Sequence, residues 1–210
     1  PKNVSKPVIA TVEIGGPFKL LAQQIWIKAK NRKPPEMGEA ITPTAVQAGS
    51  TDTGTQPLNL INGSGLRDLD SDGLTEHRGD PGFMWRSAKG DAKGWVEFDL
   101  GQPQKLGALC VWNHNDTWHT DRGVQKMDVS VWTQEGGWQK IRDDLAVDQA
   151  EGGDGYDEPT IVRLDAVTAQ KVRFDDLASC GDTDYVGLSE VQFFGPQSAK
   201  TATPVAGGGQ

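Results

Sequence analysis

The sequence predicts an all-β protein: an antiparallel β-sandwich of the jelly-roll kind with about eight strands, preceded by an N-terminal extension. Two observations predict this fold class. From about residue 41 onward, apolar and polar residues alternate in short runs that are separated by turn residues, as in strands with one buried face. The interior of the chain has no convincing helical periodicity, and many short strands without helices favour a sandwich.

The chain divides into three segments by composition. Residues 1–40 are an N-terminal extension or the tail of a preceding domain, because the polar, proline-containing stretch Asn31–Glu39 separates them from the strands that follow. Residues 41–195 form the expected sandwich. Residues 196–210 have no periodicity and are rich in Gly, Ala and Thr, which is typical of a flexible tail or linker.

Within the extension, Pro7–Ile14 predicts a strand, which Gly15-Gly16-Pro17 ends. Two interpretations remain open for the residues after it. Phe18, Leu21 and Ile25 fall at helical spacing, whereas Gln24–Lys28 alternates like a strand.

The strands of the sandwich are assigned by alternation and by the turns between them. Gly101 and Pro103 are expected to turn the chain, and Glu135-Gly136-Gly137 to form a hairpin. The nearly continuous apolar run Lys105–Trp112 predicts a central strand. The expected strands are, in order, Thr44–Ser50, Trp95–Leu100, Lys105–Trp112, Val124–Trp132, Trp138–Ile141, Thr160–Leu164, Lys171–Leu177 and Leu188–Phe194.

Charge is distributed unevenly along the chain. The net charge of −8 is the sum of +4 in residues 1–40 and −12 in residues 41–210. An acidic body repels phosphate backbones, so nucleic acid is not an expected partner. No run approaches the roughly 20 apolar residues that span a bilayer, so no membrane span is expected. The basic stretch Lys28–Lys33 is either a contact for an anionic surface or a solvated linker.

The chain has two cysteines, Cys110 and Cys180, each in or at the end of an expected strand. A disulfide between them would close a loop of about seventy residues and contribute about 4 kcal/mol. We expect this bond, because the rest of the chain is typical of extracellular proteins. The alternative is two unpaired buried thiols.

Several motifs, in their order and spacing, resemble the discoidin or coagulation factor 5/8 type C family of galactose-binding-like domains. These motifs are "NLINGSGL", "MWRS", "WVEFDLG", "LGALCVWNHN", "RGVQKMDVSV" and "GLSEVQFF". The resemblance covers about residues 45–195 and is nearest to modules of secreted bacterial carbohydrate-active and surface proteins. It implies a jelly-roll sandwich, a structural calcium ion, a ligand site in the loops at one end, and binding rather than catalysis.

Calcium is the expected cofactor, and the resemblance places Glu190 where the family often reaches the ion. The chain departs from the family at Asn62-Gly63, where Asp-Gly is common. Asp68, Asp70 and Asp72 alternate before Gly73, as in loops that wrap oxygen ligands around Ca²⁺, although the twelfth place of an EF-hand is Gly79 and not an acid. The alternative is a solvated acidic loop. The candidate metal ligands are Asn62, Asp68, Asp70, Asp72, Asp80 and Glu190.

The loop Trp112–Gly123 follows a central strand and combines an aromatic ring with amide, imidazole and guanidinium groups. Sugars present apolar C–H faces and hydroxyls, which such side chains contact. The segments His77–Phe83 and Cys180–Tyr185 are expected to converge with it. Alternatively, Trp118 packs the loop and Arg122 bridges to an Asp. Trp85, Trp95 and Trp112 are expected in the core. The candidate ligand-binding residues are His77, Arg78, Asn115, Trp118, His119, Arg122 and Tyr185.

Enzymatic motifs are missing from the sequence: it has no Gly-x-Ser-x-Gly, His-Glu-x-x-His or phosphate-binding loop. We therefore expect no catalysis, and a carbohydrate-binding module of a secreted or cell-surface protein whose partner is a polysaccharide or glycan. The alternative hypothesis is a structural domain of a surface or filament, or a protein–protein adhesion domain, that assembles with other modules through residues 1–40.

Overall fold

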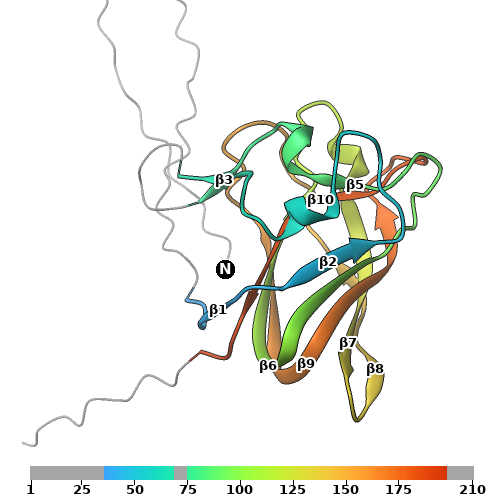
Figure 1. The fold of residues 1–210 in the computed structure, drawn as a ribbon. Helices are drawn as coiled ribbons and strands as arrows, with labels where there is room; N and C mark the ends of the chain where they lie inside the picture. Colours follow the sequence, from blue (N-terminus) through green and yellow to red (C-terminus); the bar gives the residue numbers. More distant parts are fainter. Residues whose placement is uncertain (1–35, 69–74, 198–210) are drawn as a thin grey trace, which may run out of the picture. The chain divides into compact units, whose positions relative to one another are not determined.

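Two long antiparallel strands form the frame of the domain in this computed structural model, which describes residues 36–68 and 75–197. β6 (Val96–Asn113) and β9 (Thr160–Ser179) pair along most of their length (Figure 1). The predictions for residues 1–35 and 198–210 lie outside the described residues. A compact unit begins at Glu36.

β6 and β9 were each expected as two separate strands, and in the structure each one bends and continues. Their register shifts between Asp99 and Gln104, and again between Leu106 and Ala108. Gly101 has φ 78° at the bend of β6, and Ala166 has φ 53° at the bend of β9. The predicted turns are therefore at the correct positions. However, residues with left-handed backbone conformation and β-bulges bend the strands there without ending them.

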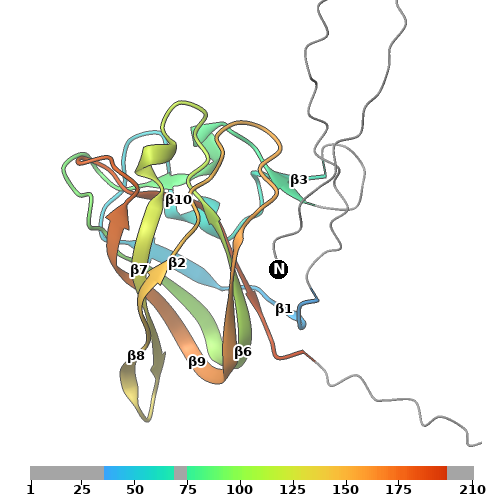
Figure 2. The same ribbon diagram turned by 180° about the vertical axis from the view of Figure 1, so that it is seen from behind.

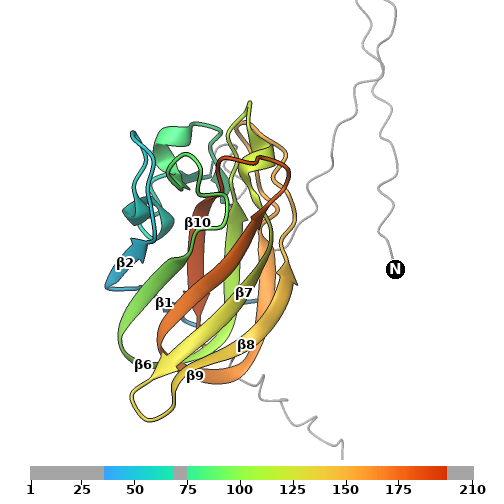
Figure 3. The ribbon, with the colours of Figure 1, turned by 90° about the vertical axis from the view of Figure 1, so that its right-hand side faces the viewer.

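The bends divide one hydrogen-bonded sheet into two facing layers (Figure 3). The first layer contains the first half of β6, the second half of β9, and three shorter strands: β2 (Ala45–Ala48), β7 (Val124–Thr133) and β8 (Gly137–Ala146). The second layer contains the other halves of β6 and β9, with β1 (Ala40–Ile41), β5 (Trp85–Arg86) and β10 (Gly187–Phe194).

Short elements complete the described chain. β3 (Leu66–Arg67) and β4 (Glu76–His77) form a separate two-stranded ribbon, and there are three 3-10 turns, η1 (Pro57–Leu60), η2 (Pro81–Phe83) and η3 (Thr120–Arg122). Residues 36–68 and 75–197 include no α-helix, and no helix among them could cross a membrane. The predicted all-β antiparallel sandwich is confirmed.

The core lies between the layers and is centred on three phenylalanines that are fully buried. The ring of Phe98 in β6 lies 5.2 Å from that of Phe174 in β9, and 5.1 Å from that of Phe193 in β10, both in edge-to-face geometry. Phe98 and Phe174 belong to the first layer and Phe193 to the second. The contact of Phe98 with Phe193 therefore joins the two layers.

The second layer is also covered on its outer face. Cys110 and Trp112 point away from the main core and pack with Ala150 and Tyr156, and the Trp112 and Tyr156 rings lie 5.4 Å apart. Since this part of β6 is buried on both faces, its sequence is apolar without alternation. This explains the continuous apolar run that predicted a central strand.

The structure contradicts the predicted disulfide, because both cysteines are free thiols. Cys110 lies on the outer face of the second layer, packed with Trp112 and Tyr156. Cys180 instead follows the half of β9 that belongs to the first layer, so the two cysteines lie in different layers. Burial raises the pKa of the Cys110 thiol to about 12, which leaves it protonated and unreactive.

The two ends of the described chain cross beside β1. The backbone N–H of Gly195 donates to the carbonyl of Glu39 at 2.8 Å, and Ala40 pairs with Phe194. Gly38 packs so closely that a Cβ atom there would lie 2.0 Å from the carbonyl oxygen of Gly195. Glycine is therefore required at position 38 by the close approach of two backbones.

We expect Gly38→Ala to lower the free energy of unfolding by about 1–3 kcal/mol, because the added methyl group forces β1 away from β10. Gly181→Ala is the matched control, since its new Cβ would be 3.9 Å from the nearest atom. Urea unfolding of both variants measures the difference. Equal stability of the two variants would show that the crossing contributes nothing to the fold.

Candidate functional site

Five loops meet at one end of the sandwich, which we call the loop end: residues 49–65, 78–84, 114–123, 147–159 and 180–186 (Figure 1). β6 and β9 end there, and β7 and β10 begin there. The expected convergence is confirmed, because Thr117 donates its N–H to Gly79 O at 3.4 Å and Asp182 donates its N–H to Asp121 O at 3.1 Å. Segments distant in sequence thus share one surface.

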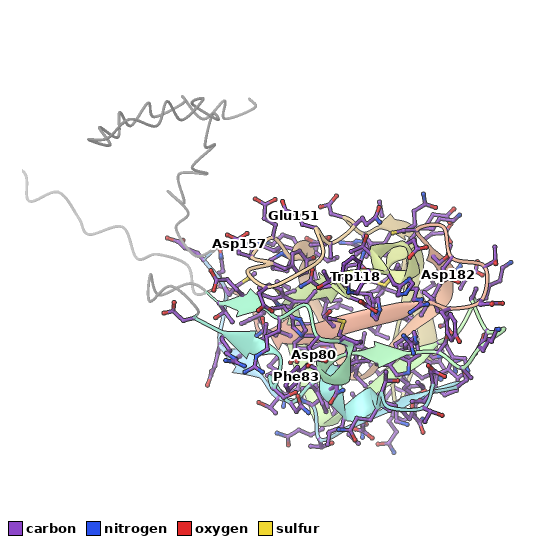
Figure 4. The ribbon with its side chains drawn as sticks, turned by 90° about the horizontal axis from the view of Figure 1, so that it is seen from above. Asp80, Phe83, Trp118, Glu151, Asp157 and Asp182 are labelled. Atoms are coloured by element: carbon purple, nitrogen blue, oxygen red, sulfur yellow. The ribbon has the colours of Figure 1, made fainter. Side chains whose placement is uncertain are left out.

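Trp118 is the most exposed large apolar side chain of the described residues, with 85% of its surface accessible. In the view from above, it lies between Glu151 and Asp157 on one side and Asp80 and Phe83 on the other (Figure 4). Its backbone N–H donates to Asp116 Oδ1 at 3.1 Å, which forms a tight turn. The ring is therefore displayed to solvent and does not pack the loop.

Two fully buried asparagines hold the Trp118 loop from below. The amide of Asn113 donates to the carbonyls of Val124 and Asp148, both at 2.8 Å, and its Oδ1 accepts the N–H of Val124 at 2.7 Å. Asn115 donates to Gly153 O at 2.6 Å and accepts the N–H of Gly152 at 3.0 Å. Because loop backbone groups need partners once they are buried, these amides make the loop rigid.

Tyr185 is held between two arginines at the same end. The guanidinium of Arg86 lies 4.9 Å from the centre of its ring, and that of Arg122 lies 4.8 Å away. Arg86 is paired with Asp52, and Arg122 Nε donates to Asp182 at 3.0 Å. The predicted alternative for Arg122, a structural bridge to an Asp, is therefore correct, and this cluster ties four segments together.

The structure separates the candidate ligand-binding residues into two groups. His77 and Asn115 are fully buried, so their assignment to a ligand is corrected: both belong to the scaffold beneath the loops. Arg78 stacks on Phe83 with its guanidinium 4.5 Å from the ring centre. Trp118, with 85% of its surface exposed, and His119, with 46% of its side chain exposed, face solvent, and Arg122 and Tyr185 line the same end.

Sequence reasoning missed Phe83, Arg86 and Asp182 at the loop end. Each lies in a segment that the sequence had already marked, since Arg86 belongs to the "MWRS" motif and Asp182 to the Cys180–Tyr185 segment. The sequence of these segments carries no local signal for the direction in which each side chain points. The strand register and the ion pairs decide which side chains of a marked segment point to the surface.

Among the described residues, the candidate metal ligands do not form one cluster. The described residues contain no group of three His, Cys, Asp or Glu side chains that could hold a metal ion. Asp80 caps η2 by accepting the N–H of Gly82 at 2.8 Å, and Asp68 is exposed after β3. Asp70 and Asp72 lie outside the described residues.

Two of the candidate metal ligands, Glu190 and Asn62, are linked by Gly63, which follows Asn62 in the chain and binds the Glu190 carboxylate. The Glu190 carboxylate is 3% exposed and accepts the N–H of Gly63 at 3.3 and 3.1 Å. Burial raises its pKa to about 8. Asn62 accepts the N–H of Ser64 at 2.9 Å. A buried carboxylate whose charge is this costly is a group that a cation would stabilise.

His77 and His114 are fully buried in the same region. Burial lowers the pKa of His77 to about 4, and burial together with the charges of Arg86 and Arg122 lowers that of His114 to about 3. Neither ring nitrogen of His114 has a hydrogen-bond partner within the described part of the chain. Both imidazoles are therefore neutral in the folded protein.

The chain matches one family model, and its fold is similar to those of three solved structures. A family model described as the F5/8 type C domain matches residues 45–191. CBM32-3 of a family 31 glycoside hydrolase from Clostridium perfringens has a TM-score of 0.54 and 17% identity, and the match covers 74% of this chain and 94% of that one. The chain has no match among the curated proteins.

The family 32 carbohydrate-binding module of Clostridium perfringens NanJ, solved with galactose, has a TM-score of 0.52 at 12% identity, covering 74% of this chain and 98% of that one. A fucose binding module from Streptococcus pneumoniae has a TM-score of 0.53 at 17% identity, covering 75% and 95%. At these identities the similarity shows a shared fold.

We expect the buried histidines to make the domain sensitive to acid. An unfolded histidine takes up a proton near pH 6.5, and these two do so only at lower pH when folded, so stability present above pH 6.5 is lost as the pH falls. Urea unfolding of Glu190→Gln at pH 7, 6 and 5 isolates this effect from Glu190. The exposed His119→Gln change should leave the slope unaltered, and a flat profile would contradict the neutral buried state.

Proposed function

Because this chain belongs to the F5/8 type C domain family, we propose that it is a non-catalytic carbohydrate-binding module whose loop end binds sugar units of a polysaccharide or glycan. The observation that carries the proposal is Trp118, which is 85% exposed on a loop held rigid by buried amides. A flat aromatic ring that a rigid loop holds open to solvent offers a platform on which the C–H face of a sugar can stack.

The chemistry of the loop end suits a sugar. The Trp118 ring offers a flat face for sugar C–H groups, and His119 beside it offers a ring nitrogen for a hydroxyl. The ion pairs of Arg122 and Arg86 hold their side chains in place before any ligand arrives. Such preorganisation lowers the entropic cost of binding.

Support also comes from the proteins with the same fold. The NanJ module was solved with galactose, and the pneumococcal protein is a fucose binding module. We propose the same class of partner here, on a secreted or cell-surface protein. The alternative of assembly through residues 1–40 has no supporting observation, since the structure describes only residues 36–40 of that segment.

Charge at the loop end favours uncharged sugars. The loop of residues 147–159 contains five acidic residues and no Lys or Arg. The nearby arginines Arg86 and Arg122 are already paired with Asp52 and Asp182. A uronic or sialic acid would therefore meet net negative charge, which opposes binding.

We further propose a structural calcium ion at Glu190 and the loop of residues 61–65. The Glu190 carboxylate would be its charged ligand, and Asn62 and backbone carbonyls of this loop would be the neutral ones, which are the oxygen ligands that Ca²⁺ prefers. When bound, the ion would neutralise the buried carboxylate and hold the loop against β10. The fit rests on the burial and the raised pKa of Glu190.

Trp118→Ala should weaken sugar binding about ten-fold or more, equivalent to at least about 1.4 kcal/mol, because the apolar platform is lost. Isothermal titration with galactose, fucose, N-acetylglucosamine and glucuronic acid measures the effect, and glucuronic acid should bind least. Gln139→Ala, in β8 and outside the five loops, is the control. Unchanged titration curves for Trp118→Ala, with the fold intact, would reject the loop end as the binding site.

Calcium should raise the melting temperature of the wild-type chain, and EDTA should lower it. Without calcium, the raised pKa of Glu190 means that its contribution is fully present below pH 4.5 and is lost as the pH rises toward 8. Melting temperatures in EDTA should therefore fall from pH 5 to pH 8 in the wild-type chain relative to Glu190→Gln. Identical melting with calcium and with EDTA would remove the ion from the proposal.

A further inference from the structure

We propose a second binding surface, separate from the loop end, on the outer face of the first layer: it binds an uncharged polysaccharide chain. We call it the tryptophan face, after Trp95, Trp132 and Trp138. The chain has seven tryptophans. Trp85 and Trp112 are buried and Trp118 is at the loop end, so three of the six that the structure describes remain for this face.

Strand register places a row of side chains across this face. Directly opposed residues of antiparallel strands point to the same side of a sheet. Ala45 opposes Asp99, Asp99 opposes Lys171, Lys171 opposes Trp132, and Trp132 opposes Trp138. The neighbouring residues Phe98, Val131 and Val172 point inward to the core, so the row points outward. The row crosses five strands and is about 19 Å long at the usual strand spacing.

The tryptophans are partly open to solvent. Trp138 is 42% exposed, and Trp132 beside it is half-buried. Trp95 precedes β6 on the same side of the strand as Glu97 and Asp99, and the Arg173 guanidinium lies 4.2 Å from the centre of its ring. Trp95 was expected in the core, but it is half-buried on this outer face, where the Arg173 guanidinium covers its ring.

A shallow polar hollow continues the row beyond Lys171. It has a volume of about 210 Å³ and is lined by Ala45, Val46, Gln47, Glu97, Asp99 and Lys171. Glu97 accepts hydrogen bonds from Lys171 Nζ at 2.9 Å and from Gln47 Nε2 at 3.2 Å. Ala45 is a small residue on an edge strand, so the hollow is open on that side. Amide, carboxylate and ammonium groups thus follow the aromatic rings.

This combination selects a polysaccharide among the possible occupants. A lipid or an apolar peptide would bury the charges of Asp99 and Lys171, which is unfavourable. A sugar chain instead stacks C–H faces on the tryptophans and exchanges hydroxyl hydrogen bonds with the polar groups. Lys171 is paired with Glu97, and Arg173 with Asp175, so the face offers little free charge and fits an uncharged polymer.

The tryptophan face is distinct from the loop end. Trp132 and Trp138 flank the turn of the β7–β8 hairpin, and both views of the ribbon place this turn at the end of the sandwich opposite the loops (Figures 1 and 2). Trp118 lies at the loop end. One polysaccharide chain on each surface would let the domain hold a polymer at two points or cross-link two chains.

Native affinity electrophoresis of the full chain tests the proposal, with gels containing mixed-linkage β-glucan, xyloglucan, galactomannan or hydroxyethylcellulose. At least one of these polymers should retard the wild-type chain, and Trp138→Ala and Gln47→Ala should each weaken that retardation about five-fold or more. Gln139→Ala is the matched control, because it lies on the same strand as Trp138 and points to the opposite side. In the Trp118→Ala variant, where the loop end is impaired, part of the retardation should remain, and adding Trp138→Ala should remove that part.

Three outcomes would overturn the proposal. The first is that none of the four polymers retards the wild-type chain. The second is that Trp118→Ala abolishes retardation while Trp138→Ala and Gln47→Ala behave as wild type, which would leave the loop end as the binding site. The third is that light scattering shows a wild-type dimer that Trp138→Ala converts to a monomer, which would make this face a contact between copies of the chain.

Discussion

The contact of Phe98 with Phe174 and Phe193 is the interaction on which the rest of the structure depends. Its Phe98–Phe193 part joins two layers that are halves of one bent sheet, and it sets the direction of the side chains next to these rings up to the bulges that shift the register. Strand residues alternate between faces, and once these rings are inside, Glu97 and Asp99 must be outside. The tryptophan face is a consequence of this alternation.

The loop end depends on a different kind of interaction. Loops that cross the end of a sandwich leave backbone groups without partners, and buried asparagines satisfy them. Asn113 and Asn115 bind backbone atoms of three separate segments, and the Trp118 turn is built on them. Buried polar groups of this kind rigidify a site at the cost of their own availability to a ligand. Asn115 and His77 are therefore scaffold residues.

Paired charges distinguish both proposed surfaces. At the loop end, Arg86 and Arg122 are held by Asp52 and Asp182, and on the tryptophan face Lys171 is held by Glu97. In each case the cation is occupied within the protein, and the groups left for a ligand are aromatic rings and neutral or acidic side chains. The domain as a whole carries an acidic excess. This charge pattern suits uncharged glycans on both surfaces.

The sequence by itself determined the fold class, the positions of most strands and the segments that meet at the loop end, because alternation and turn residues are local properties. Tertiary structure alone decided that Gly101 bends β6 without ending it, that Cys110 and Cys180 lie in different layers, and that His77 is buried while Trp118 is exposed. These outcomes depend on pairing between residues far apart in the chain. A local pattern indicates which segments form strands, whereas the register between strands determines the direction in which each side chain points.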